Sequence, residues 1–177
     1  MAGHNKWSKI KRKKEVSDAK KSKLFSKYAS LISMESRRAG GDISDPGLRA
    51  VIEKAKAESM PKENIERAIT RGTEKDASSL EVMQYECYGP GGVACIISAL
   101  SDNRNRTAQE IKHLLSKRGI SLGEPGSASW AFAKEGATYT PLTTVSLSEA
   151  DDEALEELLA ELENHDDVQE IFTNRAS

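Results

Sequence analysis

The sequence predicts an α+β protein in which a basic arm and three helices precede a ferredoxin-like βαββαβ sandwich with an extra hairpin strand. Two observations support this fold class. Apolar residues recur at helical spacing up to residue 72, and strand-like and helix-like runs alternate after residue 80. We therefore expect residues 1–72 to form the basic arm and helical domain, 73–79 a polar linker, and 80–177 the α/β domain.

Three amphipathic runs predict the helical domain. The first starts at Ser17 and stops at Gly40. The second starts at Asp45, an N-cap residue that is followed by proline at the first helical position. The third starts at Pro61 and ends just before Gly72. The cations that precede Ser17 are then left as an arm outside the helices.

The order of the later runs predicts the α/β domain. MQYECYG and GVACIISALS are rich in strand formers and are separated by a glycine-rich turn, which indicates a hairpin. The elements expected after this hairpin are a helix capped at Thr107, strands at 127–133 and 138–147, a helix capped at Ser148, and a strand at 168–173. From residue 92 onward this order is that of a ferredoxin-like unit.

The distribution of charge carries the strongest functional signal. The chain has a net charge of −2, but residues 1–27 hold ten Lys or Arg and only two acids. Residues 77–177 hold 7 Lys or Arg and 17 acids. A basic segment on an otherwise acidic chain is typical of a protein that binds a polyanion, since each neutralised phosphate releases condensed counterions.

We predict that the basic opening binds nucleic acid. The predicted contact residues are His4, Lys6, Trp7, Lys9, Lys11, Arg12, Lys13, Lys14, Lys20, Lys21, Lys23 and Lys27. Trp7 offers a flat ring that can stack on an unpaired base. Alternatively, Trp7 and Ile10 pin the arm onto the helices.

A second basic motif, SDNRNRT, lies between a predicted strand and the helix capped at Thr107. Free amides at a helix N-terminus favour anions, so Arg104 and Arg106 are candidates for a secondary phosphate contact. The alternative is that both arginines pair with acids of the same protein.

The sequence offers little for other chemistries. The run Gly89-Pro-Gly91-x-x-Ala94 resembles a dinucleotide fingerprint but leads into a strand rather than a helix. The three histidines lack catalytic or metal-ligand spacing, and Cys87 and Cys95 are expected to be buried free thiols. We therefore expect no enzymatic activity, no cofactor and no metal. No stretch approaches the length of a membrane helix, and no targeting segment is evident, which predicts a cytoplasmic location and no membrane partner.

Several long blocks resemble the YebC/PmpR family: MAGHNKWSKIKRKK, LRAVIEKAKAESMPKENIERAITRGT, YECYGPGGVACIISALSDNRNRT and LENHDDVQEIFTN. This resemblance implies a helical domain followed by α/β domains, in a protein usually described as a DNA-binding transcriptional regulator. Members are also linked to ribosomes and to synthesis of proline-rich stretches. The resemblance further implies that a domain usually inserted between SASWAFAKEG and YTPLTTVSL is missing here.

Two functions remain open at this point. One is a DNA-binding transcriptional regulator, and the other is a ribosome-associated translation factor that binds ribosomal RNA. The lysine-rich arm and the lack of a polar, base-reading helix favour RNA, whereas the usual family description favours DNA. A protein-binding adaptor that docks a partner through its acidic helix is a third possibility. We expect a monomer, because no stripe of dimer-forming residues is evident.

Overall fold

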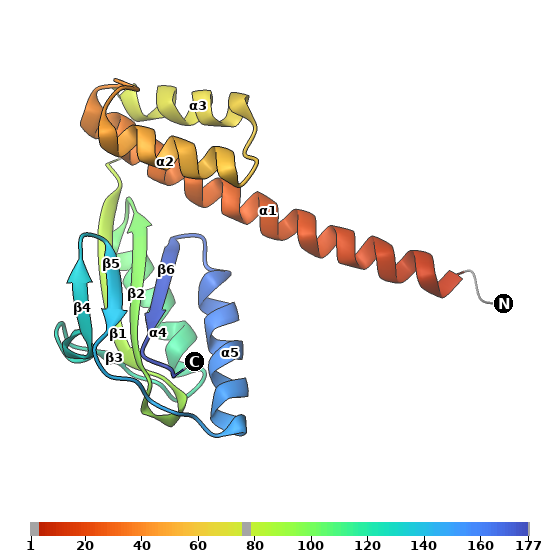
Figure 1. Ribbon diagram of the computed structural model, residues 1–177, viewed down its shortest axis with the longest axis vertical. Helices are drawn as coiled ribbons and strands as arrows, with labels where there is room; N and C mark the ends of the chain where they lie inside the picture. The colour runs from red at the N-terminus through yellow and green to blue at the C-terminus, as the bar shows by residue number, and fades with distance from the viewer. Residues whose placement is uncertain (1–3, 76–78, 177) are drawn as a thin grey trace. The chain divides into compact units, whose positions relative to one another are not determined.

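The first of two units, Met1–Ser79, is built on one long helix, α1 (His4–Ala39), which has 36 residues (Figure 1). The computed structural model describes residues 4–75 and 79–176, with side chains from residue 17 onward. The predicted start of this helix at Ser17 is wrong, because α1 already begins at His4. Residues 4–39 contain no glycine or proline and many good helix formers, so nothing breaks the helix at Ser17. The basic segment is the first part of α1 rather than an arm in front of it.

Two shorter helices, α2 (Pro46–Ala57) and α3 (Lys62–Thr73), pack against α1. The Asp45 N-cap is confirmed, since its Oδ1 accepts hydrogen bonds from the amides of Gly47 and Leu48 at 2.9 and 3.1 Å. The buried core of this unit consists of Ile32, Leu48, Ile52, Ala55, Met60, Ile65 and Ala68. Because α1 contributes to it only from Phe25 onward, the earlier turns of α1 extend past the bundle (Figure 1).

The contact between α1 and α3 is unusually close at Gly72. A Cβ atom added at Gly72 would lie 2.4 Å from the Ser33 carbonyl oxygen and 2.8 Å from the Ser36 Cβ. The hydroxyls of these two serines donate to the carbonyls of Ala68 and Ile69 at 2.9 and 2.7 Å. Serine and glycine therefore let the two backbones approach each other and bond directly.

We expect Gly72→Ala to destabilise this unit by about 1–3 kcal/mol, the usual cost of overpacking, although alanine is the better helix former. Urea unfolding followed by helix circular dichroism measures the change. The matched control is Thr70→Ala, at an exposed position of the same helix. If Gly72→Ala and this control have the same free energy of unfolding, the contact between α1 and α3 at Gly72 has room for a methyl group.

The second unit, Leu80–Ser177, contains a four-stranded antiparallel sheet in the order β3-β1-β2-β6. The expected hairpin is confirmed, because β1 (Glu81–Tyr88) pairs with β2 (Ala94–Ser101) around the short helix η1 (Pro90–Gly92). The outer strands are β3 (Leu122–Gly123) and β6 (Val168–Thr173).

The two faces of the sheet carry different layers (Figure 1). Helices α4 (Arg104–Ser116) and α5 (Glu149–Glu163) cover one face, where Ile97 of β2 packs with Ile111 and Leu158. On the other face lies the hairpin of β4 (Phe132–Glu135) and β5 (Thr138–Pro141), preceded by the short helix η2 (Ser129–Ala131). There Ile96 packs with Phe132. The α+β class is thus confirmed.

The strands expected at 127–133 and 138–147 are shorter than predicted and do not join the main sheet. β1, expected only as an extra strand, takes a central place beside β2 instead. For the start of the first run, the reason lies in Glu86 of β1, whose carboxylate accepts hydrogen bonds from the amides of Gly126, Ala128 and Ser129. Those amides are used by the carboxylate and are not available to a strand ladder.

Helix α4 starts one turn earlier than predicted. Its N-cap is Asn103, whose Oδ1 accepts from the Arg106 amide at 3.0 Å. Thr107, predicted as the cap, lies inside the helix, where its hydroxyl bonds the Asn103 carbonyl and the Asp167 carboxylate at 3.1 and 2.7 Å. The predicted Ser148 cap of α5 is confirmed, since its hydroxyl accepts from the Asp151 amide at 3.2 Å.

Candidate nucleic-acid interface

The continuity of α1 sets the register of its lysines. Positions 6, 9, 13, 20, 23 and 27 follow one another at spacings of three, four and seven residues, so they lie on one side of the helix. By the same register, this is the side away from the core positions Phe25 and Ile32. We call Lys6, Lys9, Lys13, Lys20, Lys23 and Lys27 the basic face.

Only part of the predicted contact set can be placed as side chains. Lys20 and Lys21 are exposed, whereas Lys23 and Lys27 are half-buried. The earlier side chains lie outside the described part of the structure: His4, Lys6, Trp7, Lys9, Lys11, Arg12, Lys13 and Lys14. Whether Trp7 stacks on a base therefore stays a prediction. The two acids of this segment, Glu15 and Asp18, occupy positions off the basic face.

A groove between α1 and α3 adds two arginines that the sequence analysis missed. This groove of about 360 Å³ is lined by Ser22 and Ser26 of α1 and by Arg67 and Arg71 of α3, among others. Arg67 donates to the Asn64 side chain, and neither arginine has a carboxylate partner among the described residues. Their spacing of four residues on one helix was the available signal.

Arg104 and Arg106 occupy different environments. Arg106 contacts the carboxylates of Asp167, Asp102 and Glu110 at 2.9, 3.7 and 4.0 Å, and its hydrogen bond to Asp167 raises the pKa of Arg106. Arg104 has a side chain that is 69% exposed and that reaches, among the described side chains, the carboxylate of Glu81 at 3.5 Å. The geometry of Arg106 is that of an internal ion pair, while Arg104 remains accessible to a phosphate.

These environments predict opposite results for two variants. Arg106→Ala should lower the midpoint of thermal unfolding, because Asp167 would lose its charged partner. Arg104→Ala should leave the midpoint unchanged and reduce the slope of log affinity against log salt by about one unit, the value for one phosphate contact. Equal binding slopes for Arg104→Ala and the wild type would remove Arg104 from the interface.

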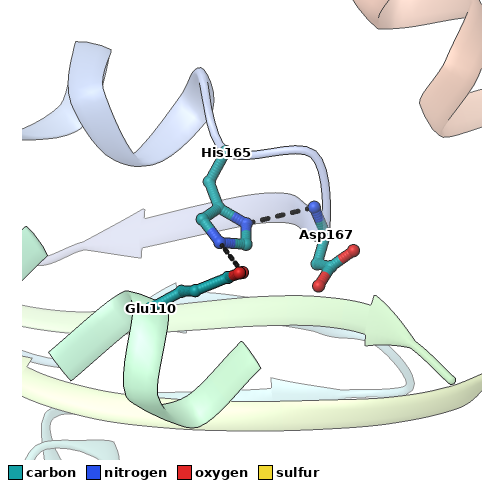
Figure 2. A group of neighbouring side chains, drawn as sticks. All are labelled: Glu110, His165 and Asp167. Atoms are coloured by element: carbon teal, nitrogen blue, oxygen red, sulfur yellow. Dashed lines mark hydrogen bonds and ion pairs between the residues drawn. The ribbon is translucent and has the colours of Figure 1, made fainter. Parts of the chain in front are cut away.

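Glu110, His165 and Asp167 form a cluster that could be taken for a metal site, since their ligand atoms lie within 4.8 Å of one another (Figure 2). The His165 Nδ1 accepts from the Asp167 amide at 3.1 Å, and the Nε2 lies 2.9 Å from the Glu110 carboxylate. An imidazole that accepts at Nδ1 carries its proton on Nε2, which then donates to Glu110 and is not free to bind a metal.

The same cluster links two segments of the second unit through hydrogen bonds and an ion pair. Burial raises the pKa of Asp167, but hydrogen bonds from Thr107 and Arg106 outweigh it, and the net pKa is lowered. The guanidinium of Arg106 already supplies the positive charge that a metal would bring. We conclude that the cluster joins the start of α4 to the segment between α5 and β6 and offers a poor cation site.

Each helix in the described part of the chain is too short or too polar to cross a bilayer.

Two models of known protein families match this chain. The TACO1/YebC protein N-terminal domain model matches residues 5–75. The TACO1/YebC second and third domain model matches residues 80–138 and 136–175, so that its two matched segments meet at the β4–β5 turn.

Two similar proteins share the same name. "Probable transcriptional regulatory protein" is the name of a Chloroherpeton thalassium relative, 50% identical over 163 residues, which cover 91% of this chain and 63% of that protein. A Thermotoga petrophila relative with the same name is 54% identical over 143 residues, covering 80% of this chain and 56% of that protein. This chain thus spans less than two thirds of the length of both relatives.

A solved structure shows the same fold. The crystal structure of a conserved hypothetical protein from Aquifex aeolicus superimposes with a TM-score of 0.81 at 31% identity, covering 90% of this chain and 91% of that one. The match of both domain models over almost the whole chain confirms the resemblance found in the sequence. This chain is a member of the TACO1/YebC family.

Proposed function

We propose that this protein is a non-enzymatic, cytoplasmic regulator of gene expression that binds nucleic acid as a monomer through the basic face of α1. The names of its relatives, probable transcriptional regulatory proteins, support a regulatory role and favour DNA as the target. The helical domain, residues 1–72, would carry the contact, with 73–79 as a linker to the acidic α/β domain.

The observation that carries the proposal is the unbroken helix from His4 to Ala39. Without it, the lysines on either side of Ser17 would have no common orientation. With it, the basic face spans about 32 Å at 1.5 Å per residue, close to one turn of B-DNA at roughly 34 Å. A rigid row of cations of this length can follow a phosphate backbone or lie along a groove.

The groove between α1 and α3 offers a second cationic surface, on the bundle-facing side of α1. Arg67 and Arg71 present planar, permanently charged groups that suit phosphate oxygens, and the hydroxyls of Ser22 and Ser26 line the same groove. Since the arginines have no carboxylate partner in the part of the chain that is described, no ion pair has to break before they bind. We assign them to a second contact surface, which is separate from the basic face.

The chemistry of the basic face also supports a second candidate, a ribosome-associated factor that binds ribosomal RNA. Lysine is a flexible point charge and reads base edges poorly compared with bidentate arginine, asparagine or glutamine. A lysine row therefore favours binding to the backbone over recognition of sequence. Folded RNA offers a phosphate backbone as well as unpaired bases.

Crosslinking in cells, followed by sequencing of the recovered nucleic acid, separates the two candidates. Promoter DNA is the expected result, and recovery of ribosomal RNA instead would replace the first candidate by the second. A competition experiment at near-physiological salt measures the sequence specificity. If the protein reads sequence, random duplex should displace a labelled promoter duplex about a thousandfold less well than unlabelled promoter does. Recovery of neither nucleic acid would contradict the proposal and favour a protein-binding adaptor.

A further inference from the structure

The second unit holds a pair of cysteines that the proposed function does not use. Cys87 of β1 and Cys95 of β2 are register partners, directly opposite each other in the antiparallel hairpin. Both side chains belong to the core cluster beneath α4 and α5, so they lie on the same face of the sheet. They are the only cysteines of the chain. The two thiols are thus neighbours by construction of the hairpin.

The spacing of such partners suits a disulfide. Directly opposite residues of an antiparallel pair have Cα atoms about 4.5–5.5 Å apart, inside the range of about 4.4–6.8 Å found for disulfides. The thiols also interact in the reduced state. The Cys95 thiol donates to the Val93 carbonyl at 3.6 Å, and the neighbouring Cys95 side chain, with burial, raises the pKa of Cys87.

Both cysteines are buried, and Cys87 borders a pocket at the surface. Cys87 lines a pocket of about 790 Å³, together with Gly89, Arg118 and Ser121. The sulfur of Cys95 lies behind Gly89, where an added Cβ would be 3.4 Å from it.

We propose that Cys87 and Cys95 form a redox-active dithiol that two-electron oxidation converts into a cross-strand disulfide. With hydrogen peroxide, both S–H bonds break, one S–S bond forms, and the peroxide takes up two protons and two electrons to give two water molecules. With a small disulfide such as oxidised glutathione, exchange proceeds through one mixed disulfide and releases two thiols. The inference does not depend on nucleic-acid binding.

The sequence allows a direct readout. No Lys or Arg lies between Lys75 and Arg104, so trypsin releases both cysteines in one peptide, residues 76–104. Oxidation to the disulfide makes this peptide lighter by two hydrogen atoms. Chymotrypsin cleavage after Tyr88 then cuts this peptide between the two cysteines, and the two fragments stay joined only if the disulfide has formed.

The test equilibrates the full chain with glutathione redox buffers, blocks remaining thiols, and counts them by mass spectrometry. The quantity to compare is the ratio of oxidised to reduced glutathione at which half of the protein is oxidised. We expect this ratio to be at least about tenfold lower for the folded protein than for the same chain in denaturant, because the hairpin holds the sulfurs together. The joined peptides should be the main oxidised product, and Cys95→Ser should not yield them. A folded chain that is no easier to oxidise than the denatured chain, or that ends with glutathione on one cysteine, would overturn the proposal.

Discussion

Replacing Lys9, Lys13 and Lys20 together by glutamine is expected to reduce the slope of log affinity against log salt by about three units. Each lysine that contacts a phosphate releases about 0.9 of a counterion from duplex DNA, and the register of α1 places these three on the basic face. Glutamine keeps the helix propensity, so helix content and the unfolding midpoint of the first unit should not change. Fluorescence anisotropy with a labelled duplex between 50 and 200 mM salt would measure the slope, in the range where such contacts are lost.

The same helix provides a control with equal charge. Lys11, Lys14 and Lys21 lie at positions on the bundle-facing side of α1 rather than on the basic face. Their replacement by glutamine removes three charges from the same segment and should change the slope by less than about one unit. Equal slopes for the two triple variants would show that the segment acts as an unstructured polycation, and the argument from the helix face would fail.

Replacing Glu86 by glutamine is expected to destabilise the second unit by about 3 kcal/mol, the lower end of the cost of disrupting a buried charged group. Glu86 is 4% exposed, and its carboxylate accepts from the amides of Gly126, Ala128 and Ser129 at 2.9, 2.7 and 2.8 Å. Glutamine has the same shape, but its NH₂ group would face backbone donors and leave at least one of them unsatisfied. Chemical denaturation followed by tryptophan fluorescence measures the loss.

This effect should depend on pH. Burial raises the pKa of Glu86, but the three backbone hydrogen bonds outweigh it, so the pKa is lowered in the folded protein. A depressed pKa means that the carboxylate contributes its stability above the pKa of an unfolded Glu, about 4.3, and loses it as the pH falls through the folded value. The difference in unfolding free energy between the wild type and Glu86→Gln should therefore be full at pH 6 and shrink below about pH 4.

The control is Glu81→Gln on the same strand, where the exposed carboxylate lies 3.5 Å from Arg104. Its effect should stay within about 0.5 kcal/mol, as is usual for surface substitutions. A difference between wild type and Glu86→Gln that does not vary with pH would mean that packing, rather than the ionised carboxylate, holds the segment 126–129.

Sequence reasoning succeeded where the signal is local. The Asp45 cap, the β1–β2 hairpin and the Ser148 cap each depend on neighbouring residues, and each is confirmed. It failed where a distant partner decides the conformation. Glu86 binds amides about 40 residues away and thereby keeps residues 126–129 out of the sheet. Nothing in a strand pattern reveals such a bond.

The candidate interface shows the same division. The basic composition of the opening was evident from the sequence. The alignment of its lysines on one helix face was not, because Ser17 can be either a helix N-cap or a residue within a helix, and only the structure shows that α1 begins at His4. Arg106 was ambiguous until Asp167, 61 residues away, proved to be its partner. Arg67 and Arg71 were missed because their groove exists only when α1 and α3 pack together.

The turn between β4 and β5 is short and lies at the surface. Glu135 pairs with Thr138, so only two residues, Gly136 and Ala137, connect the strands, and both are exposed. The chain thus leaves and re-enters the hairpin at points about 5 Å apart, the spacing of paired strands. A folded segment whose two ends lie close together can be inserted or removed at such a point without moving the β4–β5 hairpin or the main sheet. The two segments matched by the second family model meet at this hairpin, which is therefore a point where the chain can accept a folded insertion without disturbing the main sheet.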